Sequence, residues 1–145
     1  MGARDASYNR HVFTRKRGGQ ASAEALRAAV AFRKVLRSVE EAKETLLLGV
    51  PSGRAARMPL AESLAAFEQG LREARAGMDS WRIPDVETEW VACDRALGRS
   101  AERAERFRLE APTEAYEEVV SHLDEILDPL DAFAAAARRL RRLGA

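Results

Sequence analysis

Hydrophobic residues recur with a seven-residue period through the second half of the chain, and this spacing constrains the fold more than any other feature. Alternating gaps of four and three place such residues on one stripe of a helix. The first run consists of Val86, Trp90, Cys93, Leu97, Ser100, Ala104, Phe107 and Ala111. The second consists of Tyr116, Val119, Leu123, Ile126, Leu130, Phe133, Ala137 and Leu140. Pro112 separates the runs and pushes the residue before it out of the helical conformation, so the sequence predicts two helices joined by a short turn.

The order of charges predicts that these two helices pack antiparallel. Acidic residues begin each segment and arginines end it, which complements the dipole of each helix. In an antiparallel pair, the acidic start of one helix also meets the basic end of the other. On this interpretation the arginines near the C-terminus serve the helix dipole and ion pairs, rather than a nucleic-acid patch. Pro129 falls inside the second segment, so we expect a kink or a break near Glu125, where the proline removes a backbone hydrogen bond.

The first half of the chain predicts two further helices. One runs from Ser22, as the N-cap, to Leu48, and Gly49 follows it as a C-terminal cap. The next begins at Pro59 and extends to Trp81. Small residues recur in it one heptad apart, and glycine inside a helix costs about 1 kcal/mol relative to alanine. They indicate a ridge that another helix approaches closely, within this chain or from a partner. This ridge consists of Ser63, Gly70 and Gly77.

Four such helices predict an all-α protein, namely an antiparallel up-down-up-down four-helix bundle with a disordered basic N-terminal tail. A chain of 145 residues suits one domain, so we assign residues 21–145 to the bundle and residues 1–20 to the tail. An alternative keeps residues 84–143 as one kinked helix and completes the core by dimerisation. No stretch of the sequence is long and apolar enough for a membrane span, and we expect a cytoplasmic protein.

The N-terminal tail belongs to the most basic part of the chain. Residues 1–60 carry a net charge of +7, residues 61–131 one of −10, and the last 14 residues one of +4. Basic groups with interspersed aromatic rings are typical of single-stranded nucleic-acid binding. The basic groups of the tail that would make these contacts are Arg10, Arg15, Lys16 and Arg17. A solvated tail, or one that folds back onto the acidic bundle, explains the same pattern.

Residues with catalytic or metal-binding chemistry are few. The single cysteine, Cys93, falls on a core stripe and is expected to be a buried apolar residue rather than a reactive thiol. A lone metal ion would find three ligands in Glu118, His122 and Glu125, although we favour a surface histidine with acidic neighbours. Acidic and basic residues at helical spacings in the first helix predict surface ion pairs. They are Glu40, Glu41 and Glu44 with Arg33, Arg37 and Lys43.

These observations lead to a functional hypothesis without catalysis. We expect a non-catalytic helical bundle, without a cofactor, that acts by binding another protein or itself, including as a homodimer. The first alternative is nucleic-acid association through the basic tail. The second is a bundle that holds a small ligand or a metal ion between its helices.

Overall fold

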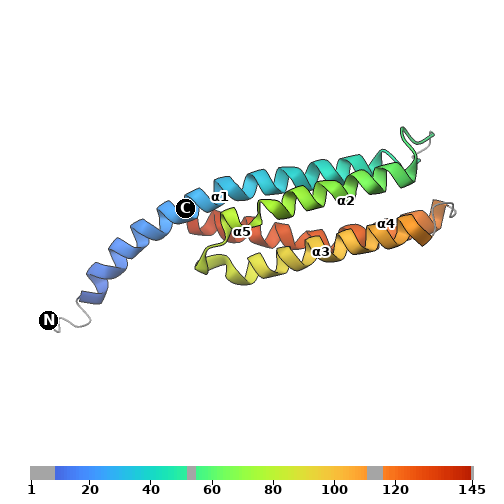
Figure 1. The fold of residues 1–145 in the computed structure, drawn as a ribbon. Helices are drawn as coiled ribbons and strands as arrows, with labels where there is room; N and C mark the ends of the chain where they lie inside the picture. The colour runs from blue at the N-terminus through green and yellow to red at the C-terminus, as the bar shows by residue number, and fades with distance from the viewer. Residues whose placement is uncertain (1–8, 52–54, 111–115, 145) are drawn as a thin grey trace.

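The computed structural model describes residues 9–51, 55–110 and 116–144, with side chains from residue 23 onward and, after the last gap, from residue 119. Its elements are α1 (Asn9–Leu47), α2 (Leu60–Ala76), the 3-10 turns η2 (Met78–Trp81) and η3 (Pro84–Val86), α3 (Glu87–Glu110), α4 (Tyr116–Leu127), the 3-10 turn η4 (Asp128–Asp131) and α5 (Ala132–Gly144). The described residues contain no strand. The predicted all-α four-helix bundle is confirmed, and α4, η4 and α5 together form its fourth helix (Figure 1).

Helices that follow one another in the sequence lie side by side. α1 contacts α2 and α5, and α3 contacts α2, α4 and α5, so each helix of the bundle has two neighbours. This is the up-down-up-down arrangement that short connections favour. Because α3 packs against the fourth helix, the alternative of one kinked helix over residues 84–143 is wrong. Within the described residues, no helix has the length and apolar character needed to cross a bilayer.

α1 begins earlier than the sequence predicted. It starts at Asn9 rather than after Ser22, and its N-terminal part extends beyond the ends of the neighbouring helices (Figure 1). Gly18 and Gly19 lie inside it. Glycine weakens a helix but, unlike proline, keeps the backbone N–H donor, so the helix continues through both residues. Residues 1–8 and the side chains up to residue 22 lie outside the described part of the chain, so the disorder of the tail stays a prediction.

The ridge predicted from the sequence packs against three residues that are also one heptad apart, two of them in α1 and one just after its end. The facing pairs are Ser63 with Gly49, Gly70 with Ala42, and Gly77 with Val35. A Cβ added to Gly70 would lie 2.8 Å from the Cβ of Ala42, and one added to Gly77 would lie 3.1 Å from Cγ2 of Val35. The close approach therefore occurs within the chain, between α1 and α2.

Pro129 divides the fourth helix, as predicted, into α4 and α5 with η4 between them. A proline at this position cannot donate to the carbonyl of Glu125, and α3 supplies the missing donor. Arg103 Nη1 donates to the carbonyl oxygen of Glu125 at 2.7 Å. One turn earlier on α3, the buried hydroxyl of Ser100 donates to the carbonyl oxygen of Ile126 at 2.6 Å. The break in the fourth helix is thus the point where α3 is hydrogen-bonded to it.

Aromatic side chains fill the core at the end of the bundle where α2 connects to α3. The ring of Phe32, from α1, contacts Trp81 edge to face at 4.9 Å and stacks on Phe133, from α5, at 6.0 Å. Trp90, from α3, donates its indole N–H to the carbonyl oxygen of Met78 at 2.9 Å. Buried indole N–H groups need such partners, and the N–H of Trp81 finds one in the sulfur of Met78. These contacts join α1, α3 and α5 to η2, the turn that follows α2.

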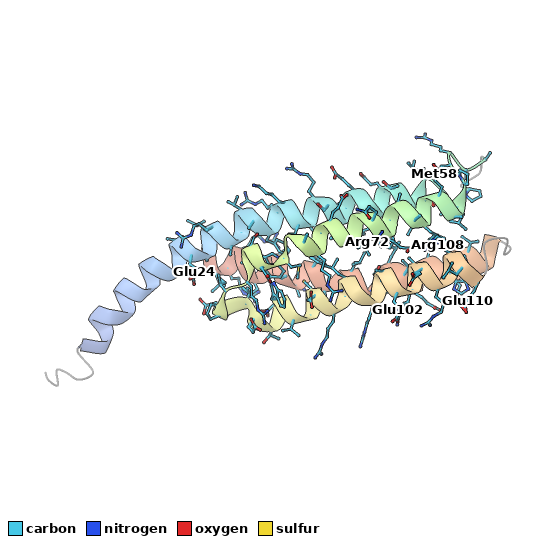
Figure 2. All side chains as sticks on the ribbon, viewed as in Figure 1. Glu24, Met58, Arg72, Glu102, Arg108 and Glu110 are labelled. Atoms are coloured by element: carbon cyan, nitrogen blue, oxygen red, sulfur yellow. The ribbon has the colours of Figure 1, made fainter. Side chains whose placement is uncertain are left out.

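A buried carboxylate links α2 to α3. Glu68 is 4% exposed, and the guanidinium of Arg108 donates to its two oxygens at 2.7 and 3.1 Å. Figure 2 shows Arg108 on the side of α3 that faces α2. The hydrogen bond that Arg108 donates to Glu68 is the main cause that raises the pKa of Arg108 above its ordinary value. A buried charge is tolerated only with such pairing, so the two residues align the helices.

We expect Gly70→Ala to destabilise the protein, although alanine is the better helix former. The added methyl group meets Ala42 on α1, and overpacking of about 1–3 kcal/mol exceeds the gain in helix propensity of about 1 kcal/mol. Gly98→Ala is the matched control, because its added Cβ would lie 3.4 Å from the flexible Arg75 side chain. The control should raise the free energy of unfolding, measured by chemical denaturation, and Gly70→Ala should lower it.

The same steric argument predicts that substitutions at Gly70 on α2 and at Ala42 on α1 are coupled in their effects on stability. Ala42→Gly should recover part of the stability that Gly70→Ala loses, because it removes the methyl group in the way. Full additivity of the two substitutions in a double-mutant cycle would contradict the assigned contact.

Candidate functional site

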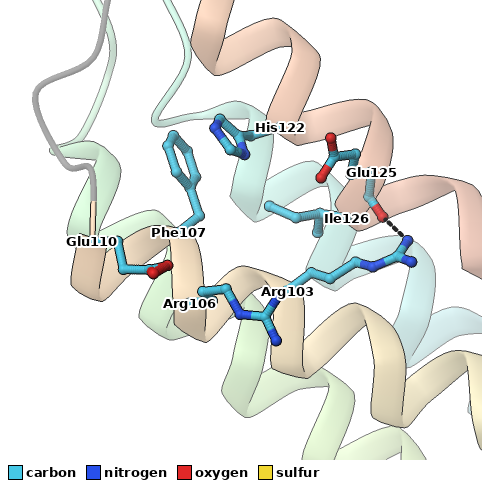
Figure 3. A pocket seen from close by; sticks show the side chains of 7 residues that line it. All are labelled: Arg103, Arg106, Phe107, Glu110, His122, Glu125 and Ile126. Atoms are coloured by element: carbon cyan, nitrogen blue, oxygen red, sulfur yellow. Dashed lines mark hydrogen bonds between the residues drawn. The ribbon is translucent and has the colours of Figure 1, made fainter.

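A polar pocket of about 310 Å³ lies between α3 and α4 (Figure 3). It is lined by Arg103, Arg106, Phe107, Glu110, His122, Glu125 and Ile126. The imidazole of His122 stacks on Phe107, with ring centroids 4.4 Å apart and planes 15° from parallel. Two arginines stand against two glutamates in this lining. The pocket therefore has no strong preference for a ligand of either charge.

Both arginines of the pocket are engaged in contacts within the chain. Arg103 donates to the backbone oxygen of Glu125, as the dashed line in Figure 3 shows, and Arg106 lies 3.6 Å from the carboxylate of Glu102. The lining residues include no serine, threonine or cysteine, and their carboxylates belong to Glu110 and Glu125. At this pocket the contact of Arg103 with Glu125 links α3 to α4.

The candidate metal ligands are only partly described. His122 and Glu125 line the same pocket, whereas the side chain of Glu118 lies outside the described residues. Among the residues that the structure describes, no group of three histidine, cysteine, aspartate or glutamate side chains is placed to hold a metal ion. Because one of its three ligands is not described, the metal site stays a prediction.

The small-residue ridge predicted from the sequence contributes no residue to the lining of this pocket. The ridge of Ser63, Gly70 and Gly77 faces α1, and Ser63 is fully buried. The basic side chains of the tail lie outside the described residues and stay a prediction; they are Arg10, Arg15, Lys16 and Arg17. The structure therefore does not bring the sequence-derived candidates together into one site.

Cys93 has the environment of a core residue. Its side chain is fully buried in α3. Burial, and to a smaller extent the charge of Glu89, raise the pKa of its thiol to about 12. The thiolate is the reactive form of cysteine, so the thiol at this position is unreactive near neutral pH.

A second, more apolar groove of about 380 Å³ lies between α1 and α5. It is lined by Leu26, Ala29, Phe32, Arg33, Leu36, Ala137, Leu140, Arg141 and Gly144. Leu26 is 53% exposed, and Val30, one turn further along α1, is 52% exposed. Contiguous exposed apolar surface marks sites of interaction with other molecules, and we take this groove with the adjoining face of α1 as the candidate site.

This candidate site was not found by the sequence reasoning. None of the candidate residues predicted from the sequence is Leu26 or Val30. Their signal is present in the sequence, because large apolar residues off the core stripe are either surface or interface. Of the six exposed large hydrophobic residues among those described, four lie in α1 or directly after it. They are Leu26, Val30, Leu47 and Leu48.

Comparison with known proteins gives no match. The chain matches no known protein family, and it has no significant similarity to curated proteins or to solved structures. A functional argument therefore rests on the surface of the protein itself.

We expect Cys93 to resist alkylation in the folded protein. A thiol pKa of about 12 leaves roughly a thousandfold less thiolate than the ordinary value near 8.5–9, and burial also excludes the reagent. Mass spectrometry after timed exposure to iodoacetamide, with and without urea, measures the difference. Equal rates in the folded and unfolded protein would contradict the buried position.

Proposed function

We propose that this protein is a non-catalytic helical bundle that acts in the cytoplasm by binding another protein or a second copy of itself. One observation carries the proposal: Leu26 and Val30 expose more than half of their side chains beside an apolar groove. Each exposed apolar side chain that a partner covers contributes about 25 cal/mol per Å² of buried area. The single cysteine, which is free and buried, supports the cytoplasmic location, because proteins of reducing compartments rarely contain disulfides.

The remaining surface supports binding rather than chemistry. The polar pocket between α3 and α4 uses its arginines for contacts within the chain, and the thiol of Cys93 is held in its protonated form. The apolar groove, by contrast, has side chains whose burial is incomplete. These properties favour an interaction module over an enzyme.

We expect the double substitution Leu26→Ser and Val30→Ser to weaken complex formation without unfolding the protein. Both side chains are largely exposed, and surface substitutions change stability by only about 0.5 kcal/mol. Light scattering of the purified protein measures self-association, and cross-linked complexes recovered with the tagged protein measure other partners. Leu109→Ser is the matched control, because Leu109 is 67% exposed on α3, away from the groove.

The control should leave both kinds of complex unchanged. A wild-type protein that is strictly monomeric and recovers no partner would rule out the proposed function. Complexes that survive the double substitution would instead move the binding site to another surface.

Nucleic-acid association is the second candidate, and one observation favours it. α1 continues beyond the neighbouring helices at its N-terminal end (Figure 1), so the backbone that carries the basic tail projects clear of the bundle. The charged groups of the tail would contact phosphates, and the strength of such contacts falls steeply with salt.

Deletion of residues 1–19 should then abolish salt-sensitive retention on immobilised DNA or RNA. The variant R10Q/R15Q/K16Q/R17Q removes the four positive charges but deletes no residue, so it separates the effect of charge from that of chain length. It should lose retention to the same degree. Retention that is the same in all three proteins would exclude the tail as a nucleic-acid contact.

A further inference from the structure

Charged residues on the outward face of α1 are sorted by sign. A basic cluster is followed along the helix by an acidic cluster. The basic cluster is Arg33, Lys34 and Arg37, and the acidic cluster is Glu40, Glu41 and Glu44. All six are exposed. They lie on the side of the helix opposite to the buried Phe32, Val39 and Leu46.

This order is unfavourable within α1 itself. The acidic Glu44 lies in the last turn, which contains no basic residue, although the helix dipole favours a cation there. Arg37 precedes Glu41 by four residues, and a base that precedes an acid is the weaker of the two intrahelical orders. The electrostatics of an isolated helix therefore do not explain the pattern.

Contacts within the described residues do not explain the pattern either. Of the six charged residues, Glu40 alone forms an ion pair with another described residue, at 3.4 Å from Lys43. Arg33 lines the same groove as Arg141, which carries a like charge. The ion pairs that the sequence predicted for Arg33 and Arg37 do not form.

Exposed apolar residues flank the two clusters. Leu26 and Val30 precede the basic cluster and are 53% and 52% exposed, and Leu47 and Leu48 follow the acidic cluster and are 53% and 38% exposed. When this face is turned end over end, its apolar ends coincide and its two charged clusters exchange places. The face of α1 is therefore complementary to a second copy of itself in the antiparallel direction.

We propose that two copies of this chain pack antiparallel through the outward face of α1, with the two-fold axis between Arg37 and Glu40. The basic cluster of each copy meets the acidic cluster of the other. Leu26 and Val30 meet the partner's Leu47 and the partner's Leu48. The inference rests on the proposed function and specifies the partner as a second copy of the chain.

The geometry of an antiparallel pair fits this face. Residues 26–48 extend over about 33 Å of helix, and the contact is isologous, so it closes with two copies instead of propagating. A parallel pair would place like charges opposite one another, which costs several kcal/mol in protein interfaces. The charged clusters thus specify direction and register, and the apolar ends contribute buried hydrophobic area.

Reversal of one cluster at a time tests the contact. R33E/K34E/R37E makes the whole face acidic, and E40R/E41R/E44R makes it basic, so each variant repels its own copy. We expect each to raise the dimer Kd about tenfold or more, measured by sedimentation equilibrium from about 1 to 100 µM. An equimolar mixture of the two variants should form a heterodimer. The variant with all six substitutions restores the complementary order and should dimerise as the wild type does.

Cysteine substitutions test the direction of the pair. Leu48 follows Val30 by five whole helical turns and so lies on the same side of α1. Val30 therefore faces the partner's Leu48 across an antiparallel contact, and V30C/L48C should form a disulfide-linked dimer on oxidation. V30C alone should migrate as a monomer in non-reducing denaturing electrophoresis. Its cysteines in the two copies of the dimer would lie about 25 Å apart. The buried Cys93 does not compete in the folded protein.

Three results would overturn this inference: a wild-type chain that stays monomeric over the same concentrations, a dimer that is unchanged in both reversed variants, or a mixture that forms no heterodimer. A chain that stays monomeric and binds a different protein or a polyanion is a case of the first result. The proposed function would survive such a result if the Leu26→Ser and Val30→Ser variant still lost a partner. Circular dichroism of each variant separates loss of the contact from loss of the fold.

Discussion

The rest of the structure depends on the close approach of α1 and α2 along a seam of residues spaced one heptad apart, namely Gly70 and Gly77 facing Ala42 and Val35. Gly70 meets Ala42 and Gly77 meets Val35, so neither helix can rotate without bringing a larger side chain into the seam. The seam therefore determines which side of α1 enters the core. Because that side is fixed, the opposite side is fixed as well, and the charged and apolar residues on the outward face of α1 are held in one orientation.

A different constraint joins α3 to the fourth helix. Pro129 leaves a carbonyl without a backbone donor, and Arg103 and Ser100 donate to two successive carbonyls at the break. A buried carbonyl without a donor costs about 1–3 kcal/mol. The contact of Ser100 with the Ile126 carbonyl is buried, whereas that of Arg103 with the Glu125 carbonyl is exposed. The polar character of the neighbouring pocket follows in part from this requirement for donors.

The seven-residue period predicted the faces of the helices because burial selects apolar residues at heptad positions, whichever helix lies opposite. It also indicated the small-residue ridge, but not the helix that covers it, since pairing depends on packing between distant segments. The predicted start of α1 was wrong because Ser22 stabilises a helix N-terminus by only about 1 kcal/mol as an N-cap. No proline between Asn9 and Ser22 stops the helix. The exposed pair Leu26 and Val30 was missed because their exposure depends on where α2 and α5 pack on α1.

Charges between the helices and charges on the outward face of α1 follow different rules. Between α2 and α3, Glu68 pairs with Arg108 and Arg75 pairs with Asp94, so opposite signs from two helices meet. On α1 the signs are separated along one helix, and the separation runs against the helix dipole. A surface shaped by solubility alone intersperses its charges. A surface of the opposite order compensates such a separation, and α1 turned end over end has that order.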